Sequence, residues 1–434
     1  LFKQRYMKLF PGHLLGSVPF LFSRELCLDP DDARRTATAI LNSFLHRETA
    51  RFLYHADSWV REHHVRQPLR IMRNDGGCGR VAKTSAVKTL DSGPMGGLAG
   101  IAALARLSRL DQIVSMDVGG TSTDVGLVDK QQPVTDLFGS VHGLPFSFSF
   151  PALSTSALGG GSLFQDQDGR IRIGPESAGA LPGPVCFGRG GKQPTLTDAA
   201  LLVGYLDAKR FAGGSINLQT EPAAQAIQDQ ISEPLRLPDA QAGAWAMIQA
   251  FADQLAQSIA AVFEGKGWDA EQTALLAFGG SGPLLAGVVA ERVGVAELII
   301  PPASSSFSAL GVGFARLAHE YRSLFQGTVS QEQWQQTVTN FQTRASRDMF
   351  GEGVAQPDCQ TAVQLRRENN AKSYVASPEA LPEIFEDNPP SKNTQTVLDY
   401  QYMHDGSGQQ QFPTTASAQE NNPHLYQSRQ SEAR

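Results

Sequence analysis

One hairpin-like segment constrains this chain more than any other part of its sequence. Residues 116–128 read MDVGGTSTDVGLV, and strand-like apolar runs at 112–116 and 125–128 flank a turn of Asp, Gly and hydroxyl residues. Glycine permits positive φ and lets a backbone approach a ligand closely. A turn of this kind can direct several backbone N–H groups toward one anion. The pattern therefore predicts two paired strands with an anion-binding turn between them.

The residue types in this turn favour a nucleotide phosphate that is carried with magnesium. The predicted cofactor-binding residues of the turn are Gly119, Gly120, Thr121, Ser122 and Thr123. Asp117 and Asp124 would repel a bare phosphate, but they fit Mg²⁺ that is bound through water beside it. We therefore predict that Asp117 and Asp124 are the catalytic, magnesium-organising residues. The alternative is a tight hairpin of ordinary turn residues, although the full Asp-x-Gly-Gly-Thr-x-Thr-Asp pattern is much more specific than Asp-x-Gly.

Composition limits the classes of partner. The chain has 434 residues, which is enough for two or three domains, and a net charge of −6. This charge argues against a nucleic-acid partner or a polybasic membrane surface, and no apolar stretch approaches the roughly 20 residues that span a bilayer. The four cysteines are widely spaced, so we expect neither a zinc framework nor a disulfide scaffold, and we predict a cytoplasmic protein.

The first residues of the chain carry no targeting signal. The sequence opens with LFKQRYMKLF, which contains no signal peptide and is typical of the interior of a longer sequence. We therefore expect a fragment or an incomplete reading frame.

A second glycine turn follows a predicted buried strand at 275–278. The turn consists of Gly279, Gly280, Ser281 and Gly282, and a helix and a further strand at 298–300 come after it. A strand, a glycine turn and a helix in this order predict an α/β crossover, and such sheets bind ligands at the carboxyl ends of their strands. We therefore predict these four residues as cofactor-binding.

Other segments give local predictions. We expect helices at 29–63 and 239–263, a strand at 69–72, strand fragments near Leu163 and at 171–173, and a solvated face for the Arg and Glu residues of the first helix. The glycine-rich residues 92–97 open a helix, either to hold a phosphate or to pack closely on a sheet. Asp198 is interpreted as a helix cap. Hydrophobic periodicity fades after about residue 325, and we expect little fixed structure from about Glu383 onward.

These segments together resemble the hydantoinase A/oxoprolinase family, which also includes the ATPase subunits of acetone and acetophenone carboxylases. The resemblance runs from about residue 17 to about residue 325. The motifs that carry it are RRTATAILNSFL (34–45), NDGG (74–77), TLDSGPMGG (89–97), MDVGGTSTDVGLV (116–128), GGGS (159–162), IGPESAGALPGPVCFGRGG (173–191), PTLTDA (194–199), AFGGSGPL (277–284) and PPASSSFSALG (301–311).

The resemblance implies an α/β chain with an actin-like, hexokinase-like ATPase fold built from RNase H-like domains, the first of them incomplete. Residues 1–110 would be a remnant of the first ATPase domain with connecting helices. Residues 111–325 would be the second RNase H-like domain, with the phosphate hairpin and an adenosine-side loop at 279–282. Residues 326–434 would be a degenerate, partly disordered C-terminal region, in which 365–375 is weakly similar to the family's C-terminal β-domain.

The resemblance also implies a function with ATP and Mg²⁺ as cofactors. The expected activity is ATP-dependent hydrolysis of cyclic amides of the hydantoin or 5-oxoproline type, in which phosphorylation activates the substrate carbonyl. A hydantoinase B-type subunit is the expected partner. Two alternatives stay open: the ATPase subunit of an acetone- or acetophenone-type carboxylase, and a truncated, non-catalytic member. Family members often carry Asp and His just before the glycine run, where this chain has PALSTS (151–156), and a histidine where this chain has Leu285, so no metal-binding or acid–base histidine is predicted at either point.

Overall fold

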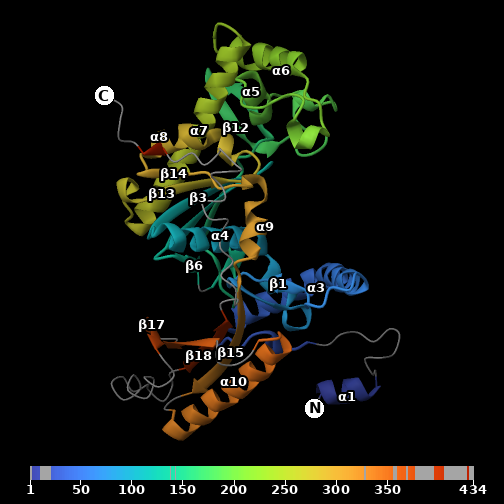
Figure 1. Ribbon diagram of the computed structural model, residues 1–434, viewed down its shortest axis with the longest axis vertical. Helices are drawn as coiled ribbons and strands as arrows, with labels where there is room; N and C mark the ends of the chain where they lie inside the picture. The colour runs from blue at the N-terminus through green and yellow to red at the C-terminus, as the bar shows by residue number, and fades with distance from the viewer. Residues whose placement is uncertain are drawn as a thin grey trace. The chain divides into compact units, whose positions relative to one another are not determined.

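The structure is a computed structural model that describes residues 2–9, 21–136, 138–141, 143–326, 329–354, 359–367, 370–376, 395–404 and 428–429 (Figure 1). It forms two compact units, each assembled from separate stretches of the chain. Unit 1 takes residues 1–95, 135–150 and 315–409, and unit 2 takes residues 96–134, 151–314 and 410–434.

A mixed sheet forms the centre of unit 2. Its strands follow the order β10 (Leu153–Ser156), β4 (Thr123–Asp129), β3 (Gln112–Val118), β13 (Ala274–Phe278), β14 (Glu297–Ile299) and β19 (Ser428–Arg429), with β5 (Gln132–Pro133) beside β4. β3 and β4 form the predicted antiparallel hairpin, and β13 runs parallel to β3. The carboxyl ends of β3 and β13 therefore meet at one edge of the sheet, as the two glycine turns predict.

Helices cover both faces of this sheet. α7 (Ala240–Lys266) and α8 (Gly282–Val293) lie on one face, and α4 (Ser92–Ser108) lies on the other (Figure 1). Val114, Met116 and Val118 point into the core shared with α7 and α8. The alternating residues point toward α4, where the Leu98 side chain lies against Gly126. Two covered faces explain why β3 and β13 read as nearly continuous apolar runs.

Unit 2 also carries an insertion between β10 and α7. It contains the hairpin of β11 (Ser162–Gln167) and β12 (Arg170–Ser177), α5 (Leu196–Leu202) and α6 (Thr220–Ile227). Asp198 is fully buried in the first turn of α5. Its carboxylate accepts hydrogen bonds from the backbone N–H groups of Thr195, Cys186 and Val185 and from the Thr195 hydroxyl, at 2.7–3.2 Å. The capping interpretation of Asp198 is therefore confirmed, with Thr195 as the N-cap residue.

The sheet of unit 1 joins segments that lie far apart in the sequence. Its strand order is β1 (Arg70–Met72), β2 (Gly77–Arg80), β15 (Arg316–Gln326), β18 (Gln395–His404), β16 (Cys359–Arg367) and β17 (Asn370–Ala376). β18 pairs antiparallel with β15 along its whole length and with β16 on its other side. The strand pair β16–β17 covers the segment 365–375 that is weakly similar to the family's C-terminal β-domain.

Unit 1 contains two long helices and several short elements. The long helices are α3 (Asp32–Glu62) and α10 (Gln331–Gly351). The short elements include α1 (Phe2–Leu9), α2 (Ser23–Leu26), β6 (Thr135–Asp136), β7 (Ser140–Val141) and β8 (Leu144–Pro145). The chain passes from unit 1 to unit 2 within β9 (Phe150–Pro151). α10 begins at the N-cap Ser330, which forms a capping box with Gln333. It buries Trp334, Val338, Phe341, Ala345 and Met349, one every three or four residues.

Two expectations for the C-terminal region were wrong. α10 lies in the region where we expected hydrophobic periodicity to fade. The helix was missed because Gln and Thr residues separate the members of its narrow apolar stripe and keep the mean hydropathy low. β18 lies at 395–404, beyond the point where we expected little fixed structure. Residues 383–394 and 405–427 lie outside the described residues.

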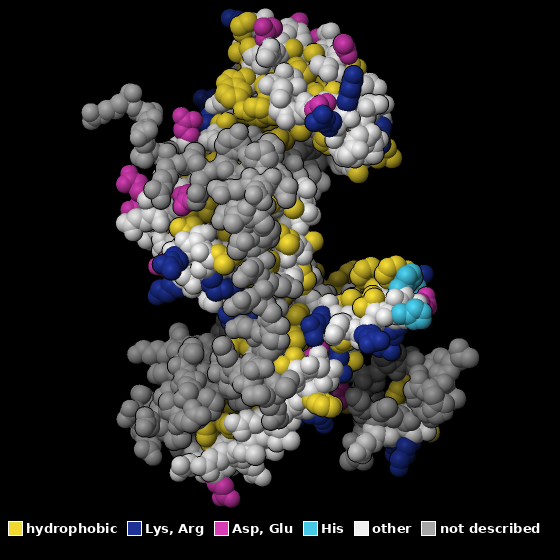
Figure 2. Space-filling model, in the orientation of Figure 1, with side chains coloured by type: hydrophobic (Ala, Val, Ile, Leu, Met, Phe, Trp, Pro, Cys, Tyr) yellow, Lys and Arg dark blue, Asp and Glu magenta, His cyan; other side chains and the backbone are white. Residues whose placement is uncertain are grey.

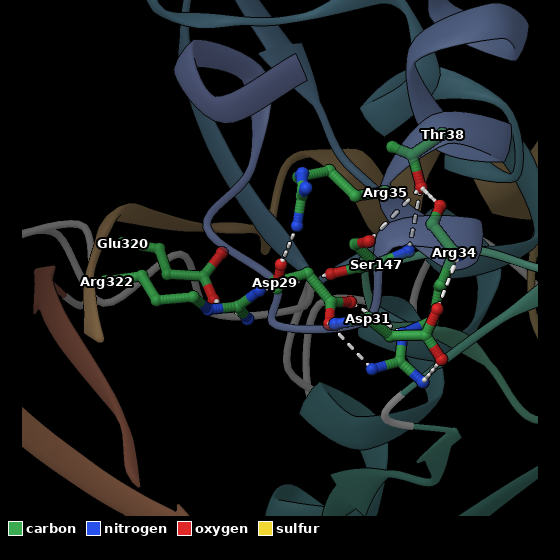
Figure 3. Close-up of polar contacts among 8 residues, drawn as sticks. All are labelled: Asp29, Asp31, Arg34, Arg35, Thr38, Ser147, Glu320 and Arg322. Atoms are coloured by element: carbon green, nitrogen blue, oxygen red, sulfur yellow. Dashed lines mark hydrogen bonds and ion pairs between the residues drawn. The ribbon is translucent and has the colours of Figure 1, made fainter. Parts of the chain in front are cut away.

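A polar network anchors the start of α3 (Figure 3). The buried Asp29 carboxylate accepts two hydrogen bonds from the Arg34 guanidinium, at 2.5 and 2.7 Å, and Arg35 donates to the Asp29 backbone carbonyl at 2.5 Å. Thr38 accepts from the Ser147 N–H at 2.9 Å, and Arg322 donates to the Ser147 carbonyl. The expected solvated face of this helix is therefore wrong for Arg34 and Arg35, which hold neighbouring segments together.

α3 exposes apolar side chains along its first half. Ile40 and Phe44 of this helix are 66% and 80% exposed, Leu144 of β8 is 59% exposed, and Figure 2 shows hydrophobic side chains gathered over the helix. They border a groove of about 760 Å³ that is lined by α3 together with Val141, Leu144 and Phe146. Among the described residues, no helix combines the length and the hydropathy that crossing a bilayer requires.

The four hydrogen bonds to Asp198 generate the first testable prediction. Asp198→Ala should lower the free energy of unfolding by about 3 kcal/mol, because it leaves buried donors without an acceptor. Asp207→Ala removes an exposed carboxylate with one backbone hydrogen bond and should cost under about 1 kcal/mol. Urea unfolding of both variants measures the difference, and equal losses would contradict the structural role of Asp198.

Candidate functional site

The β3–β4 hairpin places the two predicted carboxylates opposite each other. Asp117 on β3 pairs in register with Asp124 on β4, and Val118 pairs with Thr123. Directly opposite residues of antiparallel strands point to the same side of the sheet. A turn of residues 119–122, which we call the hairpin tip, connects the strands and is closed by a 2.9 Å bond from the Gly119 N–H to the Ser122 carbonyl.

Three consecutive glycines support the hairpin tip from behind. Gly159, Gly160 and Gly161 form a buried segment, the glycine strip, between β10 and β11. The N–H of Gly160 donates to the Gly119 carbonyl at 2.9 Å, and the N–H of Gly161 donates to the Gly120 carbonyl at 2.7 Å. A Cβ atom on Gly159 would lie 2.6 Å from the Thr121 nitrogen, so only glycine fits there. The strip therefore fixes the hairpin tip by close backbone contact.

This support decides which backbone groups of the hairpin tip can meet a ligand. Two of its carbonyl oxygens, those of Gly119 and Gly120, are bonded to the glycine strip. Within the described part of the chain, the N–H groups of Gly120, Thr121 and Ser122 have no hydrogen-bond acceptor, and Gly120 and Thr121 are exposed. Consecutive unpaired N–H groups on an exposed turn form a suitable cradle for an anion.

The two carboxylates differ in their surroundings. Burial and, to a smaller extent, the neighbouring Asp124 charge together raise the pKa of Asp117 to about 6. Asp124 has a hydrogen-bond donor, because the Thr155 hydroxyl donates to its Oδ1 at 2.6 Å. A divalent cation near this pair would offset the repulsion between the two carboxylates.

The second glycine turn lies against this hairpin. Phe278, the last residue of β13, pairs in register with Asp117, so the turn that follows reaches the same edge of the sheet. The Ser281 N–H donates to the Val118 carbonyl at 2.9 Å. Gly279 has a φ of +85°, and a Cβ there would overlap the Asp117 carboxylate. The turn continues into α8, which begins at Gly282, so the helix N-terminus lies beside the hairpin.

The structure thus brings together all of the predicted site residues within unit 2. Asp117, Asp124 and residues 119–123 come from the hairpin, and 279–282 come from the turn after β13. No contact with the hairpin was predicted for the glycine strip, which is part of the GGGS motif of the family resemblance, and no role was predicted for Thr155. The run of three glycines was visible in the sequence, but its partner was not. Thr155 could not be found without the strand register.

The donor set fits magnesium bound mainly through water. In the described ranges, no group of three or more His, Cys, Asp or Glu side chains could hold a metal ion directly. Two carboxylates beside a phosphate cradle match Mg²⁺, which keeps several waters and takes few protein ligands. The assignment of Asp117 and Asp124 to magnesium, and of the turns to a nucleotide, stays a prediction.

Two other motifs have structural explanations. Gly97 on α4 packs on the sheet, where a Cβ would lie 2.9 Å from the Phe278 ring at the end of β13, and Gly96 faces α9 (Phe307–Val312), where a Cβ would lie 2.8 Å from the Ser308 carbonyl oxygen. This supports the close-packing interpretation of that glycine-rich segment. Asp75 of the NDGG motif pairs with the buried Arg73 at 3.3 Å, and its Oδ1 accepts from the Gly77 N–H.

Comparisons with known proteins identify the family of this chain. The family model for hydantoinase/oxoprolinase matches residues 35–321. The chain belongs to the hydantoinase/oxoprolinase family. It is 31% identical to the acetophenone carboxylase gamma subunit of Aromatoleum aromaticum and 30% identical to the caprolactamase subunit alpha of Pseudomonas jessenii, and these matches cover 81% and 76% of this chain.

A solved member of the hydantoinase/oxoprolinase family has the same fold. The crystal structure of the ATP-dependent caprolactamase from Pseudomonas jessenii matches 86% of this chain and 58% of that chain, with a TM-score of 0.67 and 26% identity. The predicted fold class and family resemblance are therefore confirmed. The chain spans about half the length of the two curated relatives, 49% in each case.

The glycine strip generates a prediction on folding stability. Gly159→Ala should lower the free energy of unfolding by about 1–3 kcal/mol, because the new methyl group has to displace the backbone of the hairpin tip. Gly287→Ala on α8 is the matched control, since a Cβ there meets no atom within 4 Å, and it should be neutral or slightly stabilising. Urea unfolding measures both, and a neutral Gly159→Ala would refute the proposed close contact.

The raised pKa of Asp117 generates a prediction on stability. The folded state binds the Asp117 proton more tightly than the unfolded chain does. The contribution of Asp117 to the free energy of unfolding therefore falls as pH rises from about 4 to about 6. Asp117→Asn should therefore stabilise the protein at pH 7.5 by about 1–2 kcal/mol, below the ceiling of about 3 kcal/mol for two pKa units. The gain should disappear near pH 4.

The control for this prediction is Asp111→Asn, which changes an exposed carboxylate just before β3 and should have little effect at either pH. Denaturant unfolding at both pH values measures the difference. A loss of stability in Asp117→Asn at pH 7.5 would show that the Asp117 carboxylate is stabilised, rather than strained, in the free protein.

Proposed function

We propose that this chain binds Mg-ATP at the hairpin tip and uses it to open cyclic amides of the hydantoin or 5-oxoproline type. The observation that carries the proposal is the arrangement of three N–H groups, which have no acceptor among the described residues, beside two carboxylates and a helix N-terminus. Membership of the hydantoinase/oxoprolinase family supports an ATP-dependent reaction. The resemblance to a caprolactamase supports a cyclic amide as the substrate, since a lactam is a cyclic amide.

The chemistry of the substrate explains why ATP is needed. Resonance makes an amide carbonyl a poor electrophile, and transfer of the γ-phosphoryl group of ATP to its oxygen would produce ADP and a good leaving group. In this proposal the hairpin tip holds phosphate oxygens with its N–H groups, and Asp117 and Asp124 order the water around Mg²⁺. The turn 279–282 would border the nucleoside.

Two alternatives remain in competition. A role as the ATPase subunit of an acetone- or acetophenone-type carboxylase is favoured by the resemblance to the acetophenone carboxylase gamma subunit. A non-catalytic role would leave nucleotide binding without turnover. The relatives are subunits of larger enzymes by name, and we propose a hydantoinase B-type partner and a cytoplasmic location for this chain.

Thermal unfolding with and without Mg-ATP tests the nucleotide site. A ligand that binds only the folded state at 100 times its Kd adds about 2.7 kcal/mol, so the melting temperature should rise measurably. Asp117→Asn should abolish the magnesium-dependent part of this rise, and Asp111→Asn should retain it. Since the pKa of Asp117 is about 6, the rise in wild type should diminish as pH falls from 7.5 to 5. A well-folded wild type that does not respond to Mg-ATP would refute the site.

Phosphate release from ATP then separates the reactions. Turnover stimulated by 5-oxoproline, hydantoin or caprolactam, with a hydantoinase B-type subunit present, would support cyclic amide hydrolysis. Turnover that requires bicarbonate together with acetone or acetophenone would support the carboxylase alternative. Binding of Mg-ATP without turnover under any of these conditions would favour the non-catalytic role.

A further inference from the structure

An edge strand contributes a hydroxyl group to the candidate site. β10 lies at the end of the unit 2 sheet and pairs antiparallel with β4, and its register places Thr155 directly opposite Asp124. Asp124 in turn lies opposite Asp117. Side chains that pair directly across strands share one face of a sheet. Asp117, Asp124 and Thr155 therefore form one row across three strands.

The contact between the last two members of this row is short and specific. The Thr155 hydroxyl donates to Asp124 Oδ1 at 2.6 Å, which is typical of a bond to a charged acceptor. Within the described residues, Asp124 Oδ2 and both Asp117 oxygens have no hydrogen-bond donor. The bond therefore leaves one defined oxygen of Asp124 available to a ligand.

The exposure of Thr155 indicates that this hydrogen bond contributes little to folding stability. Thr155 is exposed, and a hydrogen bond at an exposed edge adds little to stability because water can replace it. A plain structural explanation is that threonine suits an edge strand through its branched Cβ. That explanation needs the branched carbon but not the hydroxyl, so the two roles can be separated by substitution.

We propose that Thr155 is a positioning residue of the magnesium site. Its hydroxyl holds the Asp124 carboxylate in one orientation before magnesium binds. Binding of a magnesium-bound water to Oδ2 would then cost less conformational entropy. This inference rests on the proposed function, because it assumes that Mg-ATP binds at the hairpin tip. It adds a residue from outside the hairpin to the set that determines magnesium affinity.

A magnesium titration at fixed ATP tests the proposal, with nucleotide binding followed by calorimetry. Thr155→Val keeps the branched Cβ and removes the hydroxyl, and it should raise the Mg²⁺ concentration for half-maximal binding about ten-fold. Thr155→Ser keeps the hydroxyl and should remain within about two-fold of wild type. Ser154→Ala is the matched control, since Ser154 precedes Thr155 and points to the other face of β10.

The outcomes separate this inference from the proposed function. A wild type that binds Mg-ATP, together with an unchanged magnesium requirement in Thr155→Val, would overturn the role of Thr155 and leave the site intact. Equal weakening in Thr155→Ser and Thr155→Val would also overturn it, because the hydroxyl would not be the cause. A wild type without any magnesium-dependent binding would refute both. ATP binding in EDTA should be the same in wild type, Thr155→Val, Thr155→Ser and Ser154→Ala. Thr155→Ala is a second variant without the hydroxyl and should weaken magnesium binding as Thr155→Val does.

Discussion

The two hydrogen bonds from the glycine strip to the hairpin tip are the interactions on which the candidate site depends. The N–H groups of Gly160 and Gly161 bind the carbonyl oxygens of Gly119 and Gly120, so these negative ends face the protein interior. The N–H groups of Gly120, Thr121 and Ser122 have no acceptor among the described residues and could meet an anion. A Cβ on Gly159 would lie within 3 Å of the hairpin-tip backbone, and a Cβ on Gly160 or Gly161 would lie within 3 Å of the Ser281 or Ser177 hydroxyl, so each of the three positions favours glycine. The anion cradle therefore depends on the pairing of the hairpin tip with the glycine strip, and neither segment would form it alone.

This arrangement has an electrostatic cost that a ligand can offset. Asp117 and Asp124 repel each other, and Gly279 confines Asp117 on its other side, which agrees with its raised pKa. We therefore expect the pair to oppose folding of the free protein at neutral pH. A bound cation would convert the same repulsion into a favourable interaction, so magnesium and nucleotide should bind more tightly together than either does alone. Strain of this kind is common at sites that are selected for binding rather than for stability.

The sequence predicted the elements around the site more successfully than it predicted unit 1. Strict glycine and aspartate patterns identified the hairpin and the turn after β13, because only certain residues tolerate such backbone conformations. α10 was missed because its apolar stripe is narrow, and the role of Arg34 and Arg35 was missed because their partners, Asp29 and the segments near it, depend on tertiary contacts. The bond from Thr155 to Asp124 depends on strand register, which no local pattern specifies.

The relatives indicate which part of the reaction this region can perform. The chain matches about half of an acetophenone carboxylase subunit and about half of a caprolactamase subunit, with nearly equal identity. These two proteins act on different substrates according to their names, so the features common to both cannot distinguish a ketone from a lactam. In the proposed function, the hairpin tip, supported by the glycine strip, would hold the phosphates and the turn 279–282 would border the nucleoside, and both reactions would share this nucleotide step. We infer that substrate choice depends on residues outside this row of contacts, and the phosphate step should therefore be tested before any particular substrate.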